Sequence, residues 1–166
     1  MRGEPDATGD DKNAGRERIR ILIVGFGNPL RSDDGVGWHA AQQLSRDDAP
    51  SGVKILACQQ LTPEIASFAS PAEKVLFVDA AHQGVPGEIK CRRIVPATSS
   101  GEYSHELSPA ALLTLAQTLY GRCPPAWLLT ITGESFATGD SLSPVVSAAI
   151  PALLERVKRF IDSDEK

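Results

Sequence analysis

The sequence predicts a three-layer α/β fold, in which a mostly parallel, twisted sheet carries helices on both faces. One observation is a series of short apolar runs, typical of strands buried on both faces of a parallel sheet, at residues 19–24, 53–60, 74–81 and 126–133. A second is that segments with helix start signals lie between or after these runs, at residues 32–47, 62–70, 107–121 and 142–162. In such sheets ligands bind beyond the carboxyl ends of the strands.

The first half of the chain predicts three strands separated by two helices. The run RIRILIVG ends in a glycine and leads into the first helix, which Ser32 or Asp33 is placed to cap. The run VKILACQQ is the second strand, and Thr62 and Pro63 then supply the cap and first residue of a short helix. The run KVLFVDAA completes this half as the third strand.

The second half predicts an exposed strand, two helices and a further buried strand. Residues 87–96 alternate between polar and apolar side chains, which favours an edge position and is compatible with antiparallel pairing. Ser108 and Pro109 start the next helix and Gly121 closes it, whereas Pro151 predicts a kink in the last helix.

Composition indicates one globular domain and excludes several classes of partner. The chain has 166 residues, 42% of them hydrophobic, and a formal net charge of −4 with scattered basic residues, so we expect neither a nucleic-acid nor a membrane partner. The three cysteines are far apart in sequence, which predicts reduced thiols in a cytoplasmic protein. Residues 1–18 are polar and are expected to form a disordered extension, with residues 19–163 as a single α/β domain.

The segment GFGNPLRSDDGVG, residues 25–37, follows the first strand and begins like a dinucleotide-binding turn. Leu30 occupies the position of the third glycine, and the carboxylates of Asp33 and Asp34 stand where a phosphate would bind. Because like charges repel, the turn favours a cation over an anion, and a nucleotide-binding module is the weakest hypothesis.

Polar groups from three segments could form a metal site at the carboxyl edge of the sheet. Asp34 follows the first strand, Asp79 ends the third, and His105 comes after the fourth. Two carboxylates and an imidazole suit a borderline divalent metal and leave coordination positions open. Simpler explanations also exist. Asp33 and Asp34 could serve only as acids that favour the start of a helix, and His105 could be an ordinary loop residue. His82 remains a second candidate for a ligand or a supporting group.

Four blocks in register resemble the hydrogenase maturation endopeptidases, which trim the C-terminal extension of the large subunit of nickel-iron hydrogenases. The blocks are ILIVGFGNPLRSDDGVG, VLFVDAAHQG, SHELS and LLTITGESF with the following LSPVV. The resemblance implies a phosphorylase/hydrolase-like α/β sheet and assigns Asp34, Asp79 and His105 as catalytic and metal-binding residues. Asp33 keeps a capping or supporting role, and Asp34 is the shorter of the two acids that the family uses at its position.

The resemblance also implies an activity. We expect an endopeptidase that removes the C-terminal extension of a nickel-iron hydrogenase large-subunit precursor, with nickel supplied by that precursor as the recognition signal. The predicted substrate-binding residues are Gly27, Asn28, Asp33 and Gly35. The alternative is a non-catalytic chaperone with the same fold that senses the metal without cutting.

Overall fold

The computed structural model describes residues 18–98 and 106–164. The elements follow the predicted order: β1 (Ile21–Phe26), η1 (Ser32–Gly35), α1 (Val36–Leu44), β2 (Val53–Cys58), α2 (Ile65–Ala69), β3 (Lys74–Ala81), β4 (Ile89–Ile94), α3 (Pro109–Tyr120), β5 (Ala126–Thr132) and α4 (Pro144–Asp162). The predicted disordered extension, apart from Arg18, and the candidate ligand His105 lie outside the described residues.

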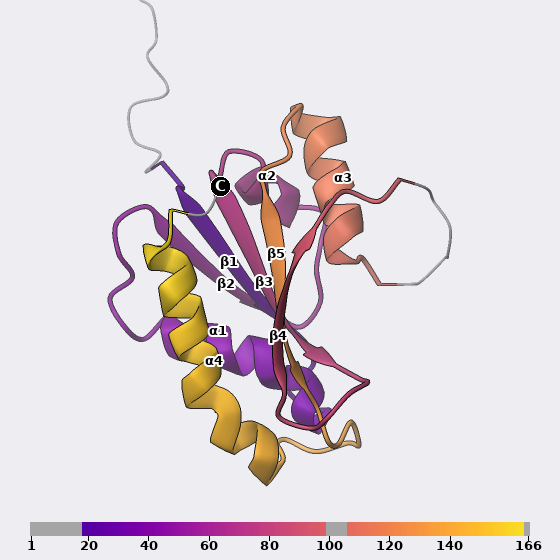
Figure 1. Cartoon of the computed structure of the whole chain (residues 1–166). Coiled ribbons are helices and arrows are strands. Elements are labelled where there is room, and N and C mark those ends of the chain that lie inside the picture. Colours follow the sequence, from indigo (N-terminus) through magenta and orange to yellow (C-terminus); the bar gives the residue numbers. More distant parts are fainter. Residues whose placement is uncertain (1–17, 99–105, 165–166) are drawn as a thin grey trace, which may run out of the picture.

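The five strands form one sheet in the order β2-β1-β3-β5-β4 (Figure 1). β1 pairs in parallel with both β2 and β3, and β3 pairs in parallel with β5. β4 pairs with β5 in the antiparallel direction and is mostly exposed. The mostly parallel sheet and its edge strand therefore agree with the sequence prediction.

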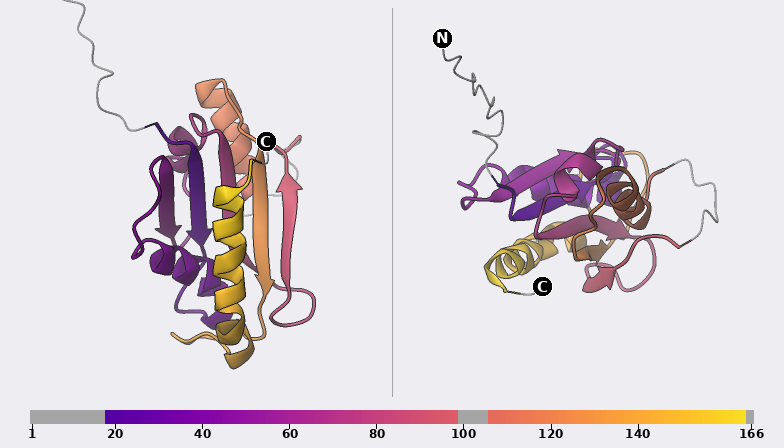
Figure 2. Two further views of the ribbon diagram at one scale, coloured as in Figure 1. Left: turned by 60° about the vertical axis from the view of Figure 1, so that its left-hand side comes forward. Right: turned by 90° about the horizontal axis from the view of Figure 1, so that it is seen from above.

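Helices cover both faces of the sheet and complete the three layers (Figure 2). One core packs α1 and α4 on β1, β3 and β5, with Val36, Leu44 and Leu153 among its buried side chains. The other packs α2 and α3 on the opposite face, where Leu112 and Phe77 are buried. In the part of the chain that the structure describes, no helix is both long and apolar enough to cross a lipid bilayer.

Two helices begin with the serine-proline signal that their sequences predict. The hydroxyl of Ser108 accepts a hydrogen bond from the Ala111 N–H at the start of α3, and Gly121 ends this helix with a φ of 73°. The hydroxyl of Ser143 accepts from the Val146 N–H at the start of α4. α4 then continues through Pro151 to Asp162, so this proline does not end the helix.

Two predicted caps are wrong. α1 is preceded by the short 3-10 helix η1, and neither Ser32 nor Asp33 makes a side-chain capping bond there, because both side chains bind the loop between β5 and α4. α2 begins at Ile65 without a side-chain cap, since residues 62–64 form a turn in which the Ile65 N–H donates to the Thr62 carbonyl.

A buried lysine joins the start of β3 to the end of α4. The Lys74 Nζ donates to the carbonyl oxygens of Phe160 at 2.6 Å and Ser163 at 2.5 Å, and lies 4.5 Å from the centre of the Phe160 ring. Carbonyl groups at a helix C-terminus carry partial negative charge, so the ammonium is stabilised despite its burial. This contact fixes the last turn of α4 against the amino-terminal edge of the sheet.

Candidate functional site

The turn after β1 brings the backbone of Gly27 directly against the backbone of Asp34. Gly27 has a φ of 138°, and a Cβ atom there would overlap the Asp34 carbonyl oxygen. Gly35 packs similarly, since a Cβ there would lie 2.5 Å from the Pro29 Cα. Both glycines thus hold the acidic turn in shape within the chain. Their contact with a substrate stays a prediction.

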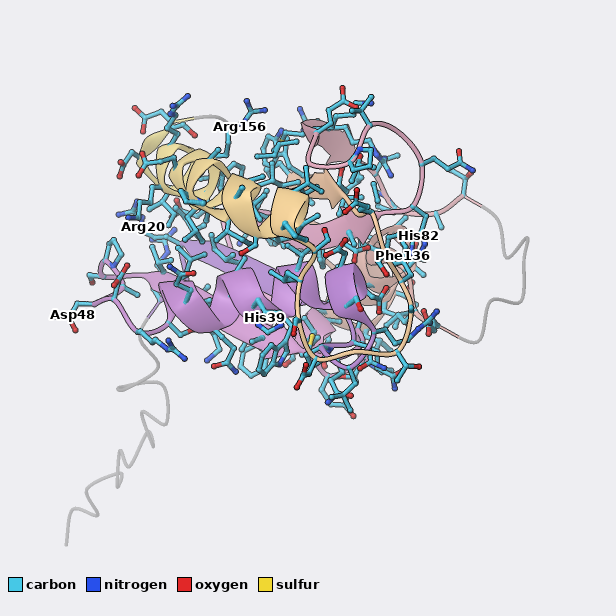
Figure 3. All side chains as sticks on the ribbon, turned by 90° about the horizontal axis from the view of Figure 1, so that it is seen from below. Arg20, His39, Asp48, His82, Phe136 and Arg156 are labelled. Atoms are coloured by element: carbon cyan, nitrogen blue, oxygen red, sulfur yellow. The ribbon has the colours of Figure 1, made fainter. Side chains whose placement is uncertain are left out.

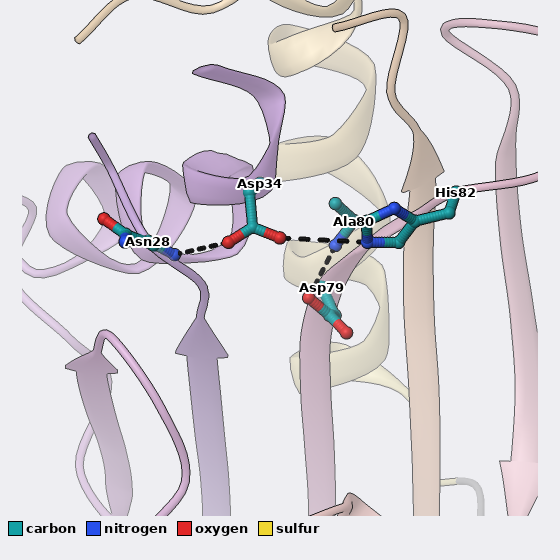
Figure 4. Close-up of polar contacts among 5 residues, drawn as sticks. All are labelled: Asn28, Asp34, Asp79, Ala80 and His82. Atoms are coloured by element: carbon teal, nitrogen blue, oxygen red, sulfur yellow. Dashed lines mark hydrogen bonds and ion pairs between the residues drawn. The ribbon is translucent and has the colours of Figure 1, made fainter. Parts of the chain in front are cut away.

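Asp34 is held by the backbone of the same turn. Its Oδ2 accepts a hydrogen bond from the Asn28 N–H at 3.0 Å, while its Oδ1 lies 3.8 Å from the His82 Nε2 (Figure 4). The Asn28 side-chain oxygen accepts from the Leu30 N–H at 2.9 Å, so Asn28 organises the turn. One carboxylate oxygen of Asp34 is therefore anchored, and the other faces the segment that follows β3.

Asp79 lies in β3, close enough to Asp34 for their charges to interact. Burial, with a smaller contribution from the negative charges of Asp34 and Glu106, raises the pKa of Asp79 to about 7 despite the lowering effect of a hydrogen bond from the Ala80 N–H. That bond, to the Asp79 Oδ1, is 2.8 Å long. The two predicted acids are thus brought together, although 45 positions separate them in the sequence. A carboxyl group with a pKa near neutrality is common at functional sites.

Asp33 supports the site from a fully buried position. Its Oδ2 accepts from the N–H groups of Glu134 at 2.8 Å and Ser135 at 3.0 Å, and its Oδ1 accepts from the Ser143 N–H at 2.7 Å. Burial alone would raise its pKa, but these three donors lower it below the ordinary value. Because the carboxylate is buried and occupied, we assign Asp33 to positioning the β5–α4 loop and not to the predicted substrate contact.

The turn after β1 and the β5–α4 loop are clamped together by their backbones. The Ser32 N–H donates to the Gly139 carbonyl at 2.9 Å, the Gly139 N–H donates to the Leu30 carbonyl at 3.0 Å, and the Ser32 hydroxyl donates to the Ala137 carbonyl at 2.8 Å. The clamp fixes the loop that carries Phe136, which lies beside His82 in Figure 3 and stacks its ring on the imidazole. Sequence reasoning missed Phe136, since no local pattern connects it to the acids.

The predicted metal triad is only partly described. Within residues 18–98 and 106–164, no group of three or more His, Cys, Asp or Glu side chains could hold a metal ion, and the predicted ligand His105 lies outside these ranges. The chemical types of the described side chains suit a divalent cation in pairs: the charge of Asp34 acts on Asp79, and the His82 imidazole lies 3.8 Å from Asp34. A cation beside the two acids would relieve the repulsion between their charges.

Several known proteins are similar to this chain, although no family model matches it. The hydrogenase 2 maturation protease of Escherichia coli is 30% identical over 148 residues, which span 84% of this chain and 88% of that protein. The hydrogenase expression/formation protein HupD of Bradyrhizobium diazoefficiens is 30% identical over 110 residues, which span 63% of this chain but only 57% of that protein.

Solved structures agree with these relatives. The hydrogenase maturating endopeptidase HybD of Escherichia coli superposes with a TM-score of 0.74 at 28% identity, over 86% of this chain and 92% of that one. The [NiFe] hydrogenase maturation protease HycI of Thermococcus kodakarensis gives a TM-score of 0.69 at 26% identity, over 87% and 94% of the two chains. The α/β sheet, the acids at its carboxyl edge and the extent of these matches lead to one conclusion: the chain belongs to the hydrogenase maturation protease family.

Proposed function

We propose that the chain is an endopeptidase that removes the C-terminal extension of a nickel-iron hydrogenase large-subunit precursor, with the precursor's nickel as its recognition signal. The observation that supports this most is the pairing of Asp34 with Asp79, whose pKa is raised to about 7 by burial and, to a smaller extent, by the negative charges of Asp34 and Glu106. Paired acids favour a bound cation, because its positive charge offsets the repulsion between their negative charges. Relatives named as maturation proteases support the reaction type.

Nickel is part of the substrate in this proposal. Asp34, Asp79 and, by resemblance, His105 would hold it, and it would supply positive charge that polarises the scissile carbonyl or activates water. Asp79 would ionise when a cation lies against it, because the charged form is then stabilised. A protein with few ligands of its own would bind free nickel weakly and the nickel-loaded precursor more tightly, which would couple cleavage to completed metal insertion.

The rigid turn after β1 would receive the precursor's tail. Gly27 and Gly35 are buried against the backbone of their own turn and keep it tightly closed, and Asn28 holds the turn through Leu30. We expect the tail to contact this turn at the half-buried Asn28, with Gly27 and Gly35 shaping the turn and Asp33 keeping the facing loop in place. We further expect the reaction to take place in the cytoplasm, which suits the free thiols of the chain's three cysteines.

The alternative is a chaperone that senses nickel in the precursor without cutting it. Its fold and acids would be the same, and only cleavage separates the two. The paired acids favour the enzyme, since sensing alone does not require a carboxyl group with a pKa near 7.

The test is cleavage of a purified nickel-loaded precursor, followed by the intact mass of the products. We expect the wild-type chain to release one C-terminal peptide, and Asp34→Asn and Asp79→Asn to be at least about a hundredfold slower, as for loss of a metal ligand. Asp48→Asn, at an exposed position, is the control and should cleave normally. Wild-type binding without any cleavage would support the chaperone instead, and full activity of both site variants would contradict the assignment of the acids.

A further inference from the structure

His82 faces Asp34 but is too far from it for a direct hydrogen bond. The distance from its Nε2 to the Asp34 Oδ1 is 3.8 Å, beyond the usual range for such a bond. The other Asp34 oxygen already accepts from the Asn28 N–H, so the oxygen that faces His82 is the free end of an anchored carboxylate (Figure 4). The His82 side chain is 61% exposed and that of Asp34 22%, so solvent reaches both side chains.

The His82 ring is held in this orientation by an aromatic partner. It stacks on Phe136 with ring centroids 3.9 Å apart and an interplanar angle of 17°. An exposed histidine with no partner would sample several rotamers, whereas a stacked one keeps its ring plane and the direction of its nitrogen. The stacking thus aims Nε2 at the open side of Asp34.

Phe136 itself is positioned by contacts of Gly133 and of the buried Asp33 with the β5–α4 loop. A Cβ atom on Gly133 would lie 2.5 Å from the Phe136 Cζ and 3.0 Å from the Asp33 Cβ, so only glycine lets the ring and the buried acid approach this closely. Asp33 meanwhile binds the N–H groups of Glu134 and Ser135, immediately before Phe136. A continuous set of contacts therefore runs from the buried Asp33 to the exposed imidazole.

The separation suits two donors that share one metal ion. Bonds from nitrogen and carboxylate oxygen to a small divalent metal are about 2.0–2.2 Å long. Two donors on the same ion can therefore lie up to about 4 Å apart. We propose that His82 Nε2 and Asp34 Oδ1 bind the same divalent cation, which makes His82 a nitrogen ligand for the nickel that the precursor presents. This rests on the proposed function for the source of the nickel, but the two donors come from the structure itself.

The resulting donor set extends the one that the resemblance implies. Imidazole is a preferred ligand of nickel, and a ligand on the segment after β3 adds one donor on the Phe136 side of Asp34. The nearby charges favour cation entry, since Asp34, Asp79 and Glu106 are all acidic and the charges of Asp34 and Glu106 act on Asp79. The precursor would complete the coordination shell.

A nickel titration followed by NMR of the histidine rings tests this directly. The chain contains three histidines, His39, His82 and His105, so few ring signals need assignment. Paramagnetic Ni²⁺ added to the full chain should broaden the His82 ring signals at substoichiometric amounts. His39 lies in the groove between α1 and α4, apart from His82 in Figure 3, and serves as the internal control whose signals should persist.

Two variants complete the test. Asp34→Asn should abolish the early broadening of His82, and His82→Gln should weaken Ni²⁺ binding measured by calorimetry at least about tenfold. Gln83→Ala, at the adjacent exposed position, is the matched control and should bind as the wild type does. The assignment would be overturned if His82 signals persist up to millimolar Ni²⁺, or if their broadening survives in Asp34→Asn.

The titration contains no precursor, so it separates the two proposals. If Ni²⁺ leaves the His82 ring signals unchanged, His82 is not a ligand. The proposed cleavage, which depends on Asp34 and Asp79, is still tested separately by the mass of the products. An absence of cleavage together with early, Asp34-dependent broadening of His82 would overturn the proposed function and leave the cation site in place.

Discussion

Replacement of Asp79 by asparagine should stabilise the protein at neutral pH and have little effect in acid. The folded chain holds the Asp79 proton until about pH 7, whereas an unfolded chain releases it near the ordinary value of 3.8. The wild-type protein therefore loses stability as pH rises from about 4 to about 7, because the unfolded state binds fewer protons over this range. Asparagine has a similar shape, carries no charge and can still accept the hydrogen bond from the Ala80 N–H.

The size of the effect follows from the difference between the two pKa values. A pKa difference of about three units corresponds to about 4 kcal/mol in the free energy of unfolding. For Asp79→Asn we expect a gain of about 2–4 kcal/mol, because the half-buried side chain keeps partial contact with water. Asp33 does not contribute to the change in stability over this pH range. Its pKa is lowered below the ordinary value, so its stabilising effect on the folded state is lost only in stronger acid.

Urea denaturation at pH 4 and pH 8, with a chelator present, measures this prediction. The free energy of unfolding of Asp79→Asn should exceed that of the wild type at pH 8 and match it near pH 4. Asp48→Asn, whose side chain is exposed, should differ little from the wild type at either pH. A difference between Asp79→Asn and wild type that is the same at both pH values would refute the reasoning, because it could not arise from ionisation.

Three further substitutions test the supports of the site and the fold, each by urea denaturation. Asp33→Asn should cost about 2–3 kcal/mol, because an amide presents a donor where three backbone N–H groups need acceptors; an unchanged midpoint would contradict this. Gly27→Ala should cost at least about 1–3 kcal/mol more than Gly121→Ala, since both residues have positive φ but only a Cβ at Gly27 meets the Asp34 carbonyl; equal costs would argue against that contact. Lys74→Met should cost about 1.5–3 kcal/mol by leaving the α4 carbonyls without their charged donor, and a neutral result would show that water replaces the ammonium.

Much of the fold could be predicted because the decisive signals are local. Continuous apolar runs identify strands buried on both faces, and the alternating pattern of β4 identifies the exposed edge. The serine-proline pairs before α3 and α4 are capping signals whose partners lie three residues away. The approach of Asp34 and Asp79 follows from topology, since β1 and β3 are parallel neighbours whose carboxyl ends share an edge.

The contacts that position the site residues could not be predicted, because the two residues of each contact are distant in sequence. Asp33 resembles a helix cap by position, yet its acceptors serve N–H groups 101 to 110 residues later. The sequence alone does not decide whether His82 is a ligand or a supporting group, since its orientation depends on Phe136 in a different loop. Such contacts arise only once the sheet has brought the two loops together. The predicted role of His105 stays a prediction, since this residue lies outside the described part of the chain.

The most direct test of the central claim is to incubate the chain with nickel-loaded and nickel-free forms of a hydrogenase large-subunit precursor and to measure the intact masses of the products. We expect one C-terminal peptide to be released from the nickel-loaded form and the nickel-free form to stay intact. Equal cleavage of both forms would contradict the role of nickel as the recognition signal, and cleavage of neither would contradict the proposed activity itself.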